Sequence, residues 1–151
     1  MESPTKAVIH SFVRELQALM ASDDSTAYTA GFLVTGMRRC LAAHGASLWI
    51  SVKHGLHRAE QLCLIRTDGR PASPEFASDV IAASVSIVRR ESTDVAPFLH
   101  IGVPISSNKS ILGVIEIAQR DVGAELTQRG YIRFISQMAE IAVPLALKLQ
   151  R

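Results

Sequence analysis

The chain has 151 residues, of which 48% are hydrophobic and 20% are charged, and its 16 basic and 14 acidic residues give a formal net charge of +2. This composition is typical of a soluble globular protein and argues against extensive disorder, and a domain of this length buries about 70% of its unfolded surface without a metal or disulfide. The nearly balanced charge offers no concentrated basic surface, so we expect no nucleic-acid partner.

The cysteines and the apolar runs indicate the compartment. Cys40 and Cys63 are the two cysteines, and they lie far apart in segments that read as buried, so we interpret both as reduced thiols. No apolar run reaches the ~18 residues that a transmembrane helix needs, and the first residues lack the pattern of a leader peptide. We therefore expect a cytoplasmic protein without direct membrane insertion and with one domain over residues 1–151.

Two helices are predicted at the start of the chain. Pro4 suits the first turn of a helix, and apolar residues then recur at helical spacing as far as Ala21. The hydroxyl and acidic side chains of residues 22–25 favour the start of a second helix. We expect Gly45, in a left-handed conformation, to end that helix.

The middle of the chain predicts strands around one short helix. Apolar residues alternate with polar ones over residues 46–52 and 60–67, which indicates two strands joined by a loop. The hydroxyl of Ser73 before Pro74 predicts the start of a short helix. The β-branched residues of 84–90 then favour a third strand.

The strongest local pattern is a β-hairpin over residues 98–120. Isoleucine, leucine and valine alternate along both halves, which predicts two strands with one wholly apolar face. A three-residue turn would pair Ser106 with Ser110. That register sets His100 opposite Glu116 on the other face of the hairpin.

The last part of the chain predicts a long amphipathic helix that ends near Leu149. Pro144 would interrupt its hydrogen bonds, so we expect a kink near Glu140. The order of elements predicts an α+β fold, in which an antiparallel five- or six-stranded sheet is covered on one face by the N-terminal and C-terminal helices. Residues 1–22 form the N-terminal helix in this interpretation, and residues 24–149 form the body of the domain.

The order of elements and the segment GVPISSNKSILGVIEIAQR (residues 102–120) resemble the GAF domain, a sensory module related in shape to PAS domains. In that family a VP(I/L) strand is followed by a polar turn and a GV(I/L) strand, and residues 103–105 and 113–115 match these. The resemblance covers residues 24–149. It implies a regulatory domain that binds a small molecule, or one that acts chiefly in dimerisation.

This sequence lacks the signatures that mark several GAF subtypes. It lacks the Asn-Lys-Phe-Asp/Glu signature of cyclic-nucleotide-binding members and the cysteine context that attaches bilins. The cysteine set of the free methionine sulfoxide reductases in the family is absent too. The resemblance therefore indicates no particular ligand or cofactor.

The face of the sheet away from the isoleucines is the predicted ligand-binding face, because family members hold ligands there. A carboxylate, an imidazole and an indole would supply hydrogen bonds and a stacking wall for a small polar or heteroaromatic ligand. The alternative is that Glu116 and His100 form a cross-strand pair whose side chains contact each other and no ligand. The predicted ligand-binding residues are Trp49, Cys63, His100 and Glu116.

The terminal helices carry more apolar surface than one face of a sheet can bury, which favours a partner. We expect a homodimer through a bundle of first and last helices, while the alternative is that both helices pack on the chain's own sheet. The predicted interface residues are Val8, Phe12, Leu16, Leu19, Ile141, Leu145 and Leu149.

Other motifs carry little chemistry. His54 and His57 have an HxxH spacing, with His44 as a conceivable third ligand, but no carboxylate or cysteine is near in sequence, so we predict no metal site. No GxSxG elbow or phosphate-binding glycine loop is present, and we expect no enzyme activity. The sequence predicts a regulatory GAF-like domain that senses a small molecule and signals through homodimerisation, or alternatively a ligand-free oligomerisation or docking module of a larger signalling or transport protein.

Overall fold

The computed structural model of the chain describes residues 4–22, 25–54, 59–69, 73–91, 98–108, 110–120 and 125–150. In these ranges, five antiparallel strands form one sheet with the order β2-β1-β5-β4-β3. The predicted α+β fold with an antiparallel sheet is confirmed. The strands are β1 (Gly45–His54), β2 (Ala59–Gly69), β3 (Ile87–Glu91), β4 (Phe98–Ser107) and β5 (Ser110–Arg120).

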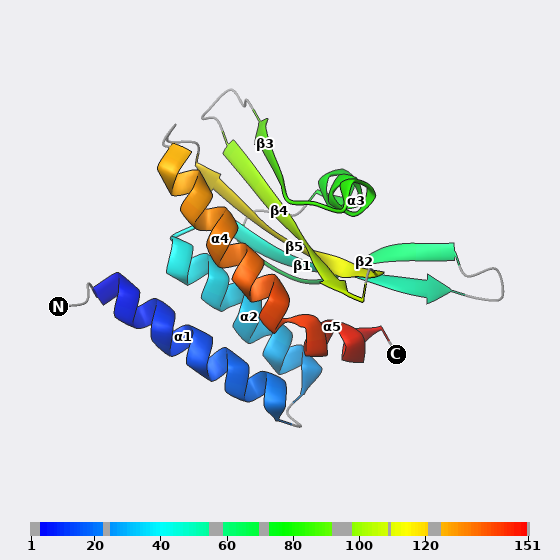
Figure 1. Cartoon of the computed structure of the whole chain (residues 1–151), viewed down its shortest axis with the longest axis horizontal. Coiled ribbons are helices and arrows are strands. Elements are labelled where there is room, and N and C mark those ends of the chain that lie inside the picture. Colours follow the sequence, from blue (N-terminus) through cyan, green and yellow to red (C-terminus); the bar gives the residue numbers. More distant parts are fainter. Residues whose placement is uncertain are drawn as a thin grey trace.

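The helices lie on both sides of the sheet (Figure 1). On one side, α2 (Thr26–Leu41), α4 (Glu125–Ile141) and α5 (Val143–Leu149) contact the strands, and α1 (Pro4–Ala21) packs on α2 and α4 as an outer layer. On the other side, α3 (Pro74–Ala83) packs on β4 and β5. The terminal helices therefore share one face, as predicted, and α3 covers part of the opposite face.

Hydroxyl caps begin α2 and α3 as the sequence predicts. The Ser25 side chain accepts a hydrogen bond from the Tyr28 backbone N–H at 3.4 Å, and the Ser73 side chain accepts one from the Phe76 backbone N–H at 3.3 Å. Each bond satisfies a backbone donor that the first turn leaves without a helical partner. The strand after α3 begins later than expected, because Ser84 first ends the helix in a left-handed conformation (φ 60°).

Two helix ends correct the sequence prediction. The left-handed residue that ends α2 is Ala42 (φ 50°), whereas Gly45 already pairs with Gly69 and Ala118 as the first residue of β1. The final helix breaks at Ala142 rather than bending near Glu140. Pro144 lies in the first turn of α5, where its missing N–H removes no helical hydrogen bond.

The register of the central hairpin also differs from the prediction. Ser107 pairs with Ser110, so the turn has two residues, and a bulge between Ile105 and Ser106 shifts the pairing. Consequently His100 lies opposite Ala118 and Glu116 lies opposite Gly102. Because the register of the strand body differs by two residues from the predicted one, each side chain keeps its predicted face although it changes its partner.

A second bulge moves Cys63 off the predicted ligand-binding face. It lies in β2, where Ile65 is left out of the register between the pairs Leu48–Arg66 and Trp49–Leu64, so that Ile50 pairs with Cys63. Directly paired residues share a face of an antiparallel sheet. The prediction that Cys63 lies beside Trp49 is therefore wrong by one residue, and the side chain of Cys63 is outside the described part of the structure.

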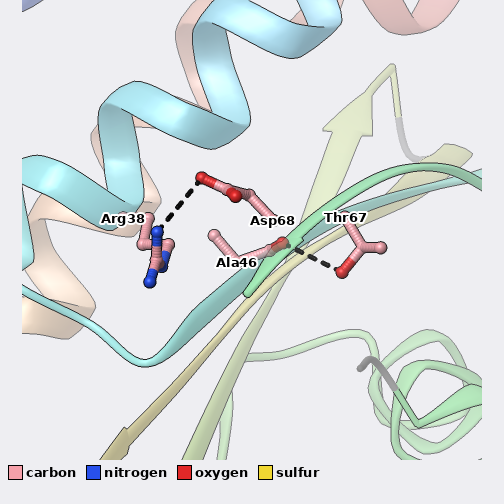
Figure 2. Close-up of polar contacts among 4 residues, drawn as sticks. All are labelled: Arg38, Ala46, Thr67 and Asp68. Carbon is pink, nitrogen blue, oxygen red and sulfur yellow. Dashed lines mark hydrogen bonds and ion pairs between the residues drawn. The ribbon is translucent and has the colours of Figure 1, made fainter. Parts of the chain in front are cut away.

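Polar contacts tie the far end of β2 to its neighbours. Asp68 forms an ion pair with Arg38 of α2, with 3.6 Å between Nη1 and Oδ2, and the Thr67 hydroxyl donates to the Ala46 carbonyl at 3.4 Å (Figure 2). Ser47 and Thr67 also share a hydrogen bond between their hydroxyls at 3.0 Å. The ion pair joins α2 to β2, whereas the Thr67 hydrogen bonds join β2 to β1.

The main core lies between the sheet and the helices α1, α2, α4 and α5. A smaller apolar cluster lies on the opposite face, where side chains of α3 meet the sheet. Among the helices that the structure describes, none is long and apolar enough to cross a membrane. The smaller cluster consists of Trp49, Phe76, Ala77, Val80 and Val114.

Candidate functional site

Glu116 is a buried carboxyl group in the middle of the sheet. It lies on β5 between Ser47 of β1 and Gly102 of β4, on the face that α3 covers, and only 3% of the residue is exposed. Carboxyl groups are rarely buried to this degree unless they are paired, because removal of the charged form from water costs several kcal/mol. The surroundings of this one side chain therefore define the candidate site.

The indole of Trp49 supplies one partner for Glu116. Trp49 pairs with Val114, two residues along β5, and its indole N–H donates to Glu116 Oε1 at 3.1 Å. The second carboxyl oxygen, Oε2, is buried and makes no hydrogen bond of standard length and angle among the described residues, although the Ser73 backbone lies close enough to the carboxyl group to lower its pKa. A buried acceptor in this state is costly, so the site is poised to accept one more donor.

The helix α3 covers the site, on the face of the sheet opposite the main core. Gly102 has no side chain, and a Cβ added there would lie 2.7 Å from Val80 Cγ2 and 3.1 Å from Phe76 Cε1. Phe76 and Val80 therefore come down onto β4 beside Glu116, and both are at most 2% exposed. This close approach explains why glycine stands opposite the carboxyl group.

His100 and Arg89 form the side of the site next to β3. His100 pairs with Arg89 in the sheet and is 8% exposed, and its ring meets the Phe76 ring edge to face with 5.8 Å between centroids. The Arg89 guanidinium lies 5.1 Å from the centroid of the Phe76 ring and forms a 2.9 Å ion pair with Asp79 of α3. These contacts hold α3 to the sheet, and the two charged groups of the ion pair remain about half exposed.

Burial changes the acidity of the site. Desolvation raises the pKa of the Glu116 carboxyl from 4.5 to about 7, although the Trp49 indole and the Ser73 backbone act in the opposite direction. Glu116 therefore changes its charge in the physiological range, which is unusual for a carboxyl group. Protonated Glu116 donates a hydrogen bond, and the ionised form only accepts.

The structure brings together three of the four predicted ligand-binding residues. Trp49, His100 and Glu116 lie on one face, as predicted, although His100 and Glu116 are diagonal neighbours rather than a direct pair. Sequence reasoning missed Phe76, Val80 and Arg89. The apolar positions after the Ser73 cap were recognised as helical, but nothing local indicated which face of the sheet this helix would cover.

Other predicted residues have different places. Leu16 and Leu145 are buried in the chain's own core at 0% and 2% exposure, and Phe12, at 7%, keeps only a small free area. Val8 is 56% exposed. Leu19, Ile141 and Leu149 are half-buried.

No group of three or more His, Cys, Asp or Glu residues gathers among the described side chains. The side chains of His54 and His57, which carry the HxxH spacing, lie outside the described residues. The third candidate ligand, His44, instead meets the Phe98 ring edge to face at 5.5 Å.

Replacement of Trp49 by Phe should test the indole contact directly. We expect Trp49→Phe to lower the free energy of unfolding by about 1–3 kcal/mol, because Glu116 loses its donor while it stays buried. The pKa of Glu116 should rise further, since this donor lowers it. Urea denaturation followed by circular dichroism, in a double-mutant cycle with Glu116→Leu, which removes the acceptor oxygens, measures the coupling energy between the two side chains. A coupling energy below about 0.5 kcal/mol would contradict a direct interaction.

The sheet order and the placement of helices define the class of protein, which is a GAF-fold domain. Solved structures confirm this. The GAF domain of nlh2 from A. aeolicus, in an inactive state, is 14% identical with a TM-score of 0.71 and covers 97% of this chain and 99% of its own. A putative GAF sensor protein from Burkholderia vietnamiensis is 12% identical with a TM-score of 0.66, over 99% and 96% of the two chains.

An enzyme shares the same fold. The free methionine-R-sulfoxide reductase from Neisseria meningitidis, solved in complex with its substrate, is 12% identical with a TM-score of 0.71 and covers 97% of this chain and 93% of its own. No protein-family model matches the sequence, and no curated protein matches it. At these identities the likeness establishes the fold alone.

Proposed function

We propose that this chain is a regulatory GAF-fold domain that binds a small molecule between the sheet and α3, with Glu116 as its polar anchor. The observation that supports this proposal is the buried carboxyl group of Glu116, whose Oε2 makes no hydrogen bond of standard length and angle among the described residues, although the Ser73 backbone lies near the group. Aromatic rings of Trp49 and Phe76 flank the carboxyl group and suit a flat ligand. The ligand class that fits is a planar cation or N–H donor, because ionised Glu116 accepts hydrogen bonds and carries negative charge.

Binding would require α3 to move. Phe76 and Val80 fill the space above Gly102, so a ligand at Glu116 displaces them from the sheet. This movement is a means of signalling, because the ligand changes the position of a whole helix. The contacts that hold α3 down on β3 are the exposed Arg89–Asp79 pair and the Arg89–Phe76 contact, which are individually weak.

A binding role is favoured over catalysis by the state of the described cysteine. Burial raises the pKa of the Cys40 thiol from 9.0, which disfavours the nucleophilic thiolate. Cys40 also lies on α2, on the other side of the sheet from Glu116. These features support a sensor rather than a thiol enzyme on the shared fold.

The second candidate is the ligand-free oligomerisation or docking module. It is favoured by the close packing of Trp49, Phe76 and Val80, each at most 4% exposed, which leaves these residues satisfied without a ligand. Native mass spectrometry of the protein purified from cells separates the candidates, because it reports a retained molecule and the number of chains together. The predicted homodimer is tested by the same measurement.

Benzamidine, a planar aromatic amidinium, is a suitable probe for the Glu116 site. We expect it to raise the melting temperature of the wild-type protein at pH 8, where Glu116 is ionised, and benzoate to leave it unchanged. Glu116→Gln should abolish the shift, and Glu140→Gln, at an exposed position of α4, should retain it. An equal shift in both variants would place the probe elsewhere. The absence of a shift, with no retained molecule, would favour the ligand-free module.

A further inference from the structure

A cavity lies between α1 and α2, on the opposite side of the sheet from Glu116. Its volume is about 720 Å³, and one residue of β2, Arg66, completes its lining. The sheet separates this groove from α3, so the two sites are independent (Figure 1). A volume of about 300–1,000 Å³ is typical of pockets for small molecules.

Aromatic side chains form the apolar wall of the groove. Phe12 stacks on Phe32 with 5.5 Å between ring centroids, and Phe32 stacks on Tyr28 with 6.5 Å. A Cβ at Gly36 would lie 2.0 Å from Phe12 Cε1, so glycine is what lets this ring approach α2. Tyr28 and Val8 remain 60% and 56% exposed at the rim, which leaves apolar surface in contact with water.

Two guanidinium groups border the same groove. The Arg66 guanidinium lies over Gly31 of α2, with Cζ 3.6 Å from where a Cβ would stand, and Arg39 lines the groove from α2. Neither makes a hydrogen bond or ion pair within the described part of the chain. The neighbouring Arg38, by contrast, is engaged by Asp68 (Figure 2).

The charge of the lining argues against a second copy as the occupant. Glu15 is the one carboxylate among the described lining residues, against the two guanidinium groups of Arg39 and Arg66. A two-fold dimer places the same patch of each chain against itself, so an excess of positive charge would face positive charge. An anion with an apolar body complements both parts of the groove.

We propose that the α1–α2 groove binds an amphipathic small-molecule anion, with its apolar body along Phe12 and Phe32 and its carboxylate at one of the two guanidinium groups that border the groove, Arg39 or Arg66. Guanidinium groups bind carboxylates through charge-assisted hydrogen bonds, and the aromatic wall removes the body from water. The site would give the terminal helix α1 its own ligand, separate from the one proposed at Glu116.

Decanoate, below its micelle concentration, is the probe. Isothermal titration calorimetry should show one decanoate per chain, and decyltrimethylammonium, which has the same chain and the opposite charge, should not bind. The double variant Arg39→Ala/Arg66→Ala should weaken decanoate binding about tenfold or more, as expected for loss of charged hydrogen bonds. The control Arg120→Ala/Arg133→Ala removes the same charge from exposed positions outside the groove and should bind like the wild type.

Three results would overturn the proposal. Equal binding of the decyl anion and cation would show non-specific apolar adsorption, and unchanged affinity in the Arg39→Ala/Arg66→Ala variant would place the anion elsewhere. A wild-type dimer that fails to bind decanoate and dissociates on Val8→Asp would assign the groove to a second copy. Glu116→Gln should leave decanoate binding unchanged, so the outcome is separable from that of the Glu116 site.

Discussion

Replacement of Glu116 by glutamine should stabilise the protein at high pH and leave it nearly unchanged at pH 4. The rise of the pKa of this carboxyl from 4.5 to about 7 corresponds to about 3 kcal/mol between its protonated and ionised forms. At pH 9 the Glu116→Gln variant should therefore have a free energy of unfolding up to about 3 kcal/mol above that of the wild type. Glutamine keeps an acceptor for the Trp49 indole N–H and carries no charge.

The direction of this pH dependence follows from the number of protons that the folded and the unfolded chain bind. Between pH 4.5 and about 7 the unfolded chain has released the Glu116 proton while the folded chain still holds it, so the unfolded state binds fewer protons. The stability of the wild type should fall as the pH rises through this window and should level off above it. Below the window both states are protonated, and glutamine resembles the protonated acid.

Urea denaturation at intervals from pH 4 to pH 9 measures the effect. The matched control is Glu140→Gln at an exposed position of α4, which should follow the wild-type profile. The fluorescence of Trp49, the one tryptophan in the sequence, should report the same transition in the folded protein, because its indole contacts Glu116. Parallel profiles for the wild type and Glu116→Gln would contradict the raised pKa.

Replacement of Gly113 by alanine should be among the most damaging single changes in the chain. A Cβ at this position would lie 2.1 Å from the Trp49 carbonyl oxygen and 3.1 Å from Ile50 Cα, which are backbone atoms of the adjacent strand. The two strands must separate to admit a methyl group, which disturbs the ladder in the middle of the sheet. We expect a loss of about 3 kcal/mol or more in the free energy of unfolding, or failure to fold.

The chain offers a matched control for this change. Gly130 lies at an exposed position of α4, with no atom within 4 Å of its hypothetical Cβ. Gly130→Ala should stabilise the protein by about 0.5–1 kcal/mol, because alanine favours the helix. Urea denaturation of both variants checks the pair. A cost below about 1 kcal/mol for Gly113→Ala would show that the strands adapt more easily than this packing implies.

The GV(I/L) pattern identified the fold but did not show why its glycine is needed. The resemblance of residues 113–115 to that pattern led to the correct fold, and solved GAF structures confirm it. The physical reason for the glycine lies in another strand, since the Trp49 carbonyl occupies the place of a side chain. The residue pattern within β5 does not show which atom of the neighbouring strand makes glycine necessary at this position.

The candidate site was predictable in part. The faces of β4 and β5 followed from alternation alone, and this put His100 and Glu116 on the correct side. The partners did not follow, because a register shift of two residues preserves every face and the apolar pattern therefore cannot distinguish the two registers. The Cys63 assignment failed for a related reason, since a bulge changes the alternation by one residue and had no signal in the sequence.

The sequence by itself determined the order of elements, a helix cap within residues 22–25, the cap at Ser73, and which hairpin face is apolar, because these depend on periodicity and on hydrogen bonds within a few residues. Only the tertiary structure decided that Trp49 meets Glu116, that α3 covers them, and that Arg66 borders the α1–α2 groove. These contacts join segments distant in sequence. They depend on bulges, turn lengths and the packing of whole elements, which local sequence does not encode.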